Sequence, residues 1–256
     1  MYSTWASFFN AASLKLPPIL FASLFSPAVA GLYALAHRAL AMPISIVGKA
    51  IADVFFSNAA VAQRKNELNI LISDIHDKLA HMAMAPTLVL ILIAPELFDF
   101  VFGSEWREAG IYAQWLAPWL YLVFITSPLG TTTFSVMEKQ AQSAIFQIIF
   151  LIGRVGAIVF GAITEDVMTT IILYAVVSAV GNLVFLIWIM VISGNSISKL
   201  ITPTIYAFLI AIVLVSPLLT AMIFFPGIQL YAIVGLLITV LFISIRYYYL
   251  LKEAYK

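Results

Sequence analysis

Long, uninterrupted apolar runs recur along the whole chain and constrain its fold more than any other feature. Runs such as "TLVLILIA" and "YAIVGLLITVLFI" lack the alternation of apolar and polar residues that membrane β-strands show. A helix that crosses about 30 Å of hydrocarbon needs about 20 mostly apolar residues. The sequence therefore predicts an all-α polytopic membrane protein with about eight transmembrane helices, at residues 4–24, 28–62, 82–102, 109–135, 140–162, 167–192, 203–225 and 229–250.

The composition agrees with this class and excludes several others. Hydrophobic residues make up 63% of the 256 residues and charged residues only 10%, whereas soluble domains are about 45–50% apolar and about 25% charged. The net charge is +1 without any run of like charges, so we expect no nucleic-acid partner. The absence of cysteine excludes thiolate metal sites and a cysteine nucleophile, and we expect no metal and no cofactor.

Basic residues divide unequally between the two sides of the membrane. One side holds eight lysines and arginines, namely Arg64, Lys65, Lys78, Lys139, Lys199, Arg246, Lys252 and Lys256. The other side holds a single arginine among acidic residues, namely Arg107, Glu96, Asp99, Glu105, Glu108, Glu165 and Asp166. Because short cytoplasmic loops are enriched in lysine and arginine, both termini are predicted to be cytoplasmic.

An amphipathic segment near residues 64–80 separates the second and third spans. Its apolar residues follow the spacing of one helical face, at Leu68, Leu71, Ile72, Ile75 and Leu79. We expect a separate interfacial helix on the cytoplasmic membrane surface. His76 and His81 point about 140° apart on a helix, so the segment is not predicted to bind a metal.

Five charged residues fall inside predicted spans: Lys15, Arg38, Lys49, Asp53 and Arg154. A charge at the centre of a membrane helix costs about 2.5–3.5 kcal/mol, so these side chains are expected to face water, a partner or a ligand. Arg38 and Lys49 lie within about 20° of each other around a helix, and Asp53 about 60° away. Lys49 and Asp53 are four residues apart, a spacing that allows an ion pair. Such a pair is the structural alternative to a cavity role for Lys49 and Asp53. For Arg38 the structural alternative is that its side chain snorkels to the membrane interface.

Polar residues in two further spans extend this pattern. Gln140, Gln147 and Arg154 recur every seven residues and predict a polar stripe. The span 109–135 carries hydroxyls at Thr126, Ser127, Thr131, Thr132, Thr133 and Ser135. Such hydroxyls line a hydrated path or bond neighbouring helices. Four buried cations against one anion predict a positive cavity, polar at Gln140, Gln147, Thr131 and Thr132, that attracts phosphate, pyrophosphate or acidic sugars.

Three stretches carry a family resemblance: "GLYALAHRALAMPISIVGKAI", "LIAPELFDFVFGSEWREAGIYAQWLAPWLY" and "FITSPLGTTTFSVMEKQ". Their order resembles the second half of bacterial polysaccharide-export flippases of the O-antigen type, which act in lipopolysaccharide synthesis. Their superfamily, called MOP, also includes the multidrug and toxin extrusion (MATE) transporters and the lipid II flippases. The resemblance covers about residues 15–192 and includes no catalytic signature.

The resemblance implies a transporter rather than an enzyme. Such proteins have 12 to 14 helices in two six-helix lobes around a cavity that opens alternately to each side of the bacterial inner membrane. They move a polyprenyl-pyrophosphate-linked oligosaccharide to the outer leaflet. Lys15, Arg38, Lys49 and Arg154 would then bind the substrate in a cationic cavity. Apart from the resemblance, Asp53 is a candidate for coupling transport to protons or for an ion pair. Partners would be the lipid-linked substrate, membrane lipid and the polysaccharide polymerase machinery.

The predicted spans match only part of that architecture. Residues 1–192 correspond to the carboxy-terminal lobe and residues 193–256 to two additional helices, while the six helices of the amino-terminal lobe are missing. We expect either that the chain is a fragment or truncated reading frame, or that another chain supplies the missing lobe.

Two other functions stay open from sequence. A drug or cation exporter of the MATE type would place carboxylates in the cavity, where Asp53 is the one candidate. A membrane enzyme acting on polyprenyl-linked sugars would use paired carboxylates in the loop that holds Glu96, Asp99, Glu105 and Glu108.

Overall fold

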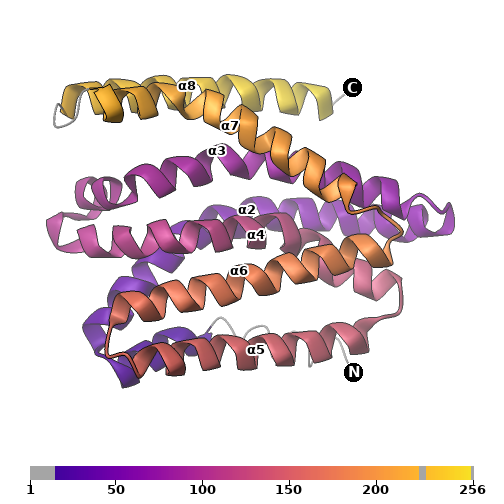
Figure 1. Ribbon diagram of the computed structural model, residues 1–256. Coiled ribbons are helices and arrows are strands. Elements are labelled where there is room, and N and C mark those ends of the chain that lie inside the picture. The colour runs from indigo at the N-terminus through magenta and orange to yellow at the C-terminus, as the bar shows by residue number, and fades with distance from the viewer. Residues whose placement is uncertain (1–14, 225–228, 255–256) are drawn as a thin grey trace.

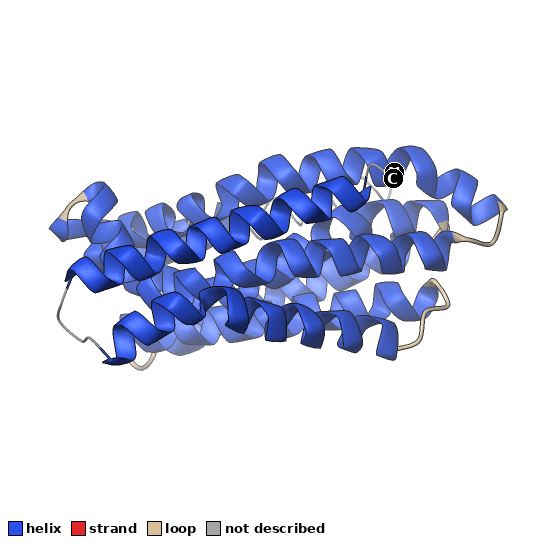
Figure 2. Cartoon of the chain, turned by 90° about the horizontal axis from the view of Figure 1, so that it is seen from above, coloured by secondary structure: helices blue, strands red, loops and turns tan. Residues whose placement is uncertain are grey.

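The computed structural model describes residues 15–224 and 229–254, and within these ranges every regular element is a helix (Figure 1). The elements are a helix at Lys15–Leu24, α2 (Pro27–Arg64), α3 (Leu68–Phe102), a 3-10 helix η1 (Ser104–Trp106), α4 (Arg107–Val136), α5 (Gln140–Ala162), α6 (Val167–Ile192), α7 (Ser198–Phe224) and α8 (Gln229–Ala254). The long helices lie side by side in one bundle, as Figures 1 and 2 both show.

Seven helices in the described part of the chain are long and apolar enough to cross a membrane. They correspond to the predicted spans from 28–62 onward, so the prediction of an all-α polytopic membrane protein is confirmed. The predicted span 4–24 is described only from Lys15, and its earlier residues lie outside the described part.

The segment at 64–80 differs from its prediction as a separate helix. Residues from Leu68 onward continue without a break into the third span and form the first half of α3. The apolar stripe is buried at Leu68, Ile72 and Leu79 within the same core as residues of α7. Helix α7 packs on this stretch of α3, so the apolar stripe is buried against protein.

The helices are arranged around α4, which packs against α2, α3 and α6. On one side α7 lies on α3 and α8 on α7, and on the other side α5 lies on α6 (Figure 1). Close approach depends on glycine where helices cross. A Cβ at Gly110 of α4 would lie 2.5 Å from the carbonyl oxygen of Ala94 in α3, and a Cβ at Gly161 of α5 would lie 2.7 Å from Thr170 Cα in α6.

Helix starts are fixed by local caps. Ser26 Oγ accepts a hydrogen bond from the Val29 amide at 3.2 Å, with Pro27 at the first helical position of α2. The Asp166 carboxylate accepts bonds from the amides of Met168 and Thr169, at 3.3 and 2.8 Å, and so begins α6.

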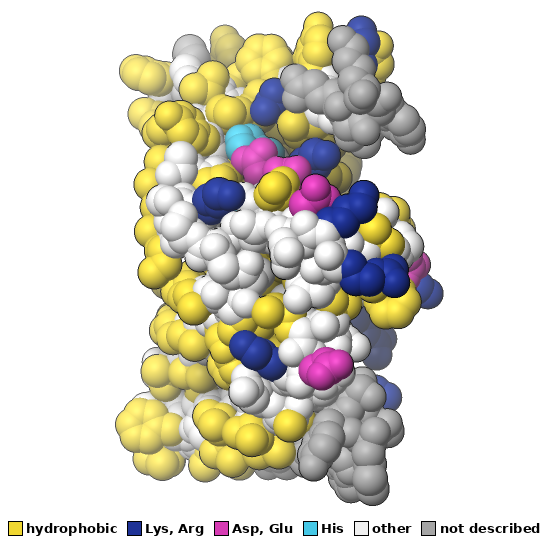
Figure 3. All heavy atoms as spheres, turned by 90° about the vertical axis from the view of Figure 1, so that its right-hand side faces the viewer, with side chains coloured by type: hydrophobic (Ala, Val, Ile, Leu, Met, Phe, Trp, Pro, Cys, Tyr) yellow, Lys and Arg dark blue, Asp and Glu magenta, His cyan; other side chains and the backbone are white. Residues whose placement is uncertain are grey.

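The connections at the two ends of the bundle differ in charge. Arg64, Lys65, Lys139 and Lys199 lie in or beside connections at the same end, and Figure 3 shows basic side chains on this face together with fewer acidic ones. At the opposite end Arg107 Nη2 donates to Glu96 Oε1 at 2.7 Å. The bundle therefore has a basic end and an acidic end.

Candidate functional site

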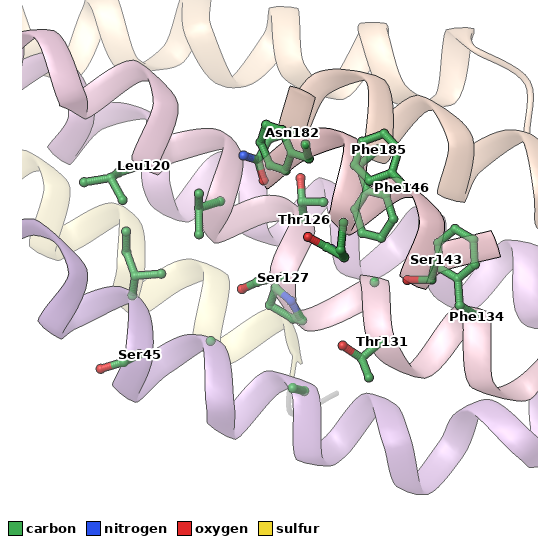
Figure 4. A pocket seen from close by; sticks show the side chains of 18 of the residues that line it. Ser45, Leu120, Thr126, Ser127, Thr131, Phe134, Ser143, Phe146, Asn182 and Phe185 are labelled. Carbon is green, nitrogen blue, oxygen red and sulfur yellow. The ribbon is translucent and has the colours of Figure 1, made fainter. Parts of the chain in front are cut away.

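A cavity of about 460 Å³, with polar and charged side chains among apolar ones, lies among α2, α4, α5 and α6. This volume falls in the range of about 300–1,000 Å³ typical of small-molecule sites. Figure 4 shows hydroxyls from α2, α4 and α5 and phenyl rings from α4, α5 and α6 around the same space. Its polar or charged lining residues are His37, Ser45, Lys49, Thr126, Ser127, Thr131, Ser135, Gln140, Ser143, Gln147, Arg154 and Asn182. Within the described residues, two cations and no carboxylate line it.

Arg154 lines this cavity and is only 4% exposed. Its Nε donates to Ser178 Oγ of α6 at 3.1 Å. The guanidinium carbon lies 4.0 Å from the centre of the Phe150 ring and 5.1 Å from that of the Trp119 ring. Aromatic faces attract cations through their quadrupole, so these contacts offset part of the cost of burying the charge.

Phe150 reaches its place under Arg154 because α6 has a glycine opposite it. A methyl group at Gly181 would overlap the Phe150 ring. The glycine therefore gives the ring room to lie between α5 and α6. Gly181 thus positions the surface on which the guanidinium rests.

His37 of α2 belongs to an aromatic cluster beside Arg154. Its ring stacks on Tyr33 at 5.9 Å and on Trp119 at 5.7 Å, measured between ring centroids. The Tyr33 hydroxyl donates to the Tyr174 hydroxyl at 3.3 Å, and Tyr174 meets Trp119 edge-on at 5.3 Å. This cluster joins α2, α4 and α6, and its members His37 and Trp119 line the cavity.

The structure brings five of the predicted site residues to this one cavity. Gln140, Gln147 and Arg154 line it from α5 over a length of about 21 Å, at 1.5 Å per residue. Lys49 enters from α2 and Thr131 from α4. The spacing of seven residues between these side chains on α5 therefore places them in one continuous polar stripe along the helix.

The other predicted site residues lie elsewhere. Lys15, Arg38 and Asp53 have exposed side chains outside the cavity lining, and Thr132 is buried in packing that does not face it. Arg38 and Thr132 point away from the cavity because their neighbours His37 and Thr131 face it. Successive residues of a helix are rotated by about 100° from each other.

The expected ion pair between Lys49 and Asp53 does not form. Among the described residues, the two ion pairs within 4.0 Å are His81–Asp77 and Arg107–Glu96. Both Lys49 and Asp53 have exposed side chains. The structural alternative for Lys49 is therefore not supported.

Sequence reasoning missed His37, Trp119, Ser178 and Asn182. His37 and Tyr33 are four residues apart and stack on one helical face, a spacing that was visible in the sequence. No sequence signal connected these residues to Trp119 or to α6, because those contacts depend on how separate helices pack.

An apolar groove of about 520 Å³ lies on the other side of the contact between α2 and α4. Leucine, valine, proline and phenylalanine side chains from α2, α3 and α4 line it, with Tyr247 of α8 at its edge. Ile44 and Leu120 border both spaces. A thin apolar wall therefore separates the cationic cavity from the groove.

Residues 1–110, which include α2 and α3, match a family model described as polysaccharide biosynthesis protein. No curated protein and no solved structure matched the chain. The family match supports the resemblance to polysaccharide-export proteins. Seven described helices are long and apolar enough to cross a membrane, as in a multi-pass membrane protein, and the first 110 residues are similar to a polysaccharide biosynthesis family.

Proposed function

We propose that this chain is the carboxy-terminal portion of a flippase that moves a polyprenyl-pyrophosphate-linked oligosaccharide, such as an O-antigen unit, across the bacterial inner membrane. The observation that carries the proposal is the cavity between the helices that Lys49 and Arg154 line without a carboxylate among the described residues. The match to a polysaccharide biosynthesis family supports the class of substrate.

The electrostatics of the cavity favour an anion. The buried Arg154 and the exposed Lys49 together give the cavity a positive field that concentrates anionic ligands. Phosphate oxygens accept the charge-assisted hydrogen bonds that arginine and lysine donate. Hydroxyl and amide groups such as Ser127, Gln147 and Asn182 can bond the uncharged remainder of a headgroup.

The proposed transport cycle depends on the orientation of the bundle in the membrane and on the prolines inside its helices. The basic end would face the cytoplasm with both termini, as the positive-inside rule requires. Prolines at positions 43, 118 and 128 lie inside the continuous helices α2 and α4 and would let these helices bend while the site changes access. The first six-helix lobe, from the same gene or another chain, would complete the cavity.

Neither alternative function is favoured by a specific contact. A cation exporter needs a carboxylate in the cavity, and Asp53 lies outside the lining. At the acidic end, Glu96 is paired with Arg107 and Glu108 accepts a hydrogen bond from the Tyr112 hydroxyl at 3.0 Å. These carboxylates therefore have structural partners at the bundle end.

Binding to the purified protein in lipid nanodiscs tests the proposal. Native mass spectrometry would compare three ligands: a polyprenyl-pyrophosphate-linked saccharide, the matching neutral polyprenol and a lipophilic cationic drug. We expect saturable binding of the pyrophosphate ligand alone. Equal binding of the neutral polyprenol, or tighter binding of the cation, would overturn the proposed substrate class.

A further inference from the structure

Among the described residues, three ionisable side chains line the cavity: His37, Lys49 and Arg154. Histidine is the only one of these residue types whose charge ordinarily changes between pH 5 and pH 8. Asp53, the candidate for proton coupling from sequence, lies outside the lining. The imidazole of His37 is therefore the group in the described lining that can exchange a proton near neutral pH.

Both ring nitrogens of His37 are accessible. Within the described part of the chain neither nitrogen makes a hydrogen bond, and neither is a fully buried atom without a partner. The other two histidines differ. His76 Nε2 lies 3.3 Å from the carbonyl oxygen of Leu200. His81 Nδ1 lies 2.9 Å from the carbonyl oxygen of Asp77. The space that the His37 side chain lines is the cavity, so its nitrogens can meet a ligand there.

The imidazole and the Arg154 guanidinium belong to the same part of the lining. The His37 ring stacks on Trp119 with 5.7 Å between the ring centroids. Arg154 Cζ lies 5.1 Å from the centroid of the same Trp119 ring. Pyrophosphate consists of two linked phosphate groups, so it can accept hydrogen bonds from more than one such donor at a time.

The charged side chains that act on the His37 ring are both cations, namely Arg154 of α5 and Arg38 of its own helix. Helices α2 and α6 also bring the hydroxyls of Tyr33 and Tyr174 to the ring cluster. Helix α4 contributes no ionisable side chain to the described lining. Because no carboxylate lines the cavity among the described residues, the counterion for a protonated imidazole has to come with the ligand.

We propose that His37 is a further binding group for the pyrophosphate and that it takes up a proton when this anion binds. The inference rests on the proposed function. A ring nitrogen accepts the proton from the surrounding water, and the resulting imidazolium donates a charge-assisted hydrogen bond to a phosphate oxygen. Since binding and protonation favour each other, affinity for the pyrophosphate rises as the pH falls.

The test uses two variants that cannot take up this proton. His37→Gln keeps a polar side chain, and His37→Phe keeps an aromatic ring in the stack. The matched control is His81→Gln, because His81 lies outside the cavity lining and pairs with Asp77.

The assay is isothermal titration calorimetry of each protein in nanodiscs of a zwitterionic lipid, between pH 6 and pH 8. Titrations with saccharide-linked polyprenyl pyrophosphate in buffers of different ionisation enthalpy measure both the affinity and the number of protons taken up. Both phosphates of this diester stay ionised over that range, so the ligand itself contributes no proton.

We expect the wild type and His81→Gln to take up protons on binding, up to one per ligand. Both should bind more tightly at the lower pH, by at most about tenfold per pH unit, which is the limit for one linked proton. Both His37 variants should bind without proton uptake and with an affinity that does not change with pH. Proton uptake that persists in a folded His37 variant, or that is absent from the wild type, would overturn the role of His37.

Two results distinguish this inference from the proposed function. A wild-type protein that bound no pyrophosphate lipid at any pH would refute the proposed function, whereas one that bound it without proton uptake would refute only the role of His37. Thermal unfolding identifies a variant that is misfolded. A merely structural role in the ring cluster would lower the melting temperature of the His37 variants but leave their proton uptake as in the wild type. If both variants misfold, the proton uptake of the wild type and of His81→Gln decides the outcome.

Discussion

Replacing Arg154 with glutamine should weaken binding of the pyrophosphate-linked lipid far more than the same change at Lys49. Arg154 is 4% exposed and lines the cavity. Truncating one partner of a buried charge pair costs about 2–5 kcal/mol, which corresponds to about 30-fold or more in affinity at about 1.4 kcal/mol per tenfold.

Lys49 lines the same cavity but its side chain is exposed to solvent. Exposed ion pairs contribute about 0.2–1 kcal/mol, so Lys49→Gln should reduce affinity by about fivefold at most. The difference arises because water screens Lys49 and not Arg154.

Titrations by native mass spectrometry in nanodiscs would measure both affinities, with thermal unfolding as the check on folding. Glutamine keeps a group that can bond Ser178, so Arg154→Gln should remain folded. Equal losses for the two variants, or an unchanged affinity of Arg154→Gln, would refute the assignment of Arg154 as the principal anion-binding group.

Three further predictions concern packing and pH. Gly110→Ala places a methyl group 2.5 Å from a backbone oxygen of α3 and should destabilise the fold by about 1–3 kcal/mol, measured by thermal unfolding. Gly181→Ala should displace Phe150 and lower affinity for the pyrophosphate lipid, and unchanged affinity would contradict its positioning role. Hydrogen bonds from Thr169 hold the pKa of Asp166 below its ordinary value. Because a lowered pKa stabilises the fold above the ordinary pKa of about 3.9, the melting temperature of Asp166→Ala should lie below that of the wild type at pH 6, and the difference should vanish as the pH falls through the lowered pKa.

The membrane spans could be predicted from sequence because each is recognised by the length of its own apolar run, independently of the other helices. Helix α5 begins at Gln140 and ends at Ala162 as expected, since loop residues interrupt the apolar pattern there. The segment that begins at Leu68 was assigned to the membrane surface because an amphipathic pattern does not say what covers its apolar face. Here α7 covers it.

The cavity was only partly predictable. The stripe from Gln140 to Arg154 could be found because residues seven apart share a helical face. Arg38 was expected in the cavity, but its neighbour His37 faces it instead. The contacts of Arg154 with Trp119 and Ser178 depend on the packing of α4 and α6 against α5, which no local pattern specifies.

Access of water to the cavity is the most direct test of the account. The chain has no cysteine, so single-cysteine variants can be labelled without background. Gln147→Cys and Ser127→Cys lie in the cavity lining, whereas Ile152 of α5 is 66% exposed on an apolar face and serves as the control. A charged, membrane-impermeant thiosulfonate should label both cavity cysteines, the lipid-linked saccharide should protect them, and Ile152→Cys should stay unlabelled. Cavity cysteines that resist the reagent as fully as Ile152→Cys would mean a dry interior, and would contradict the existence of a hydrated anion site.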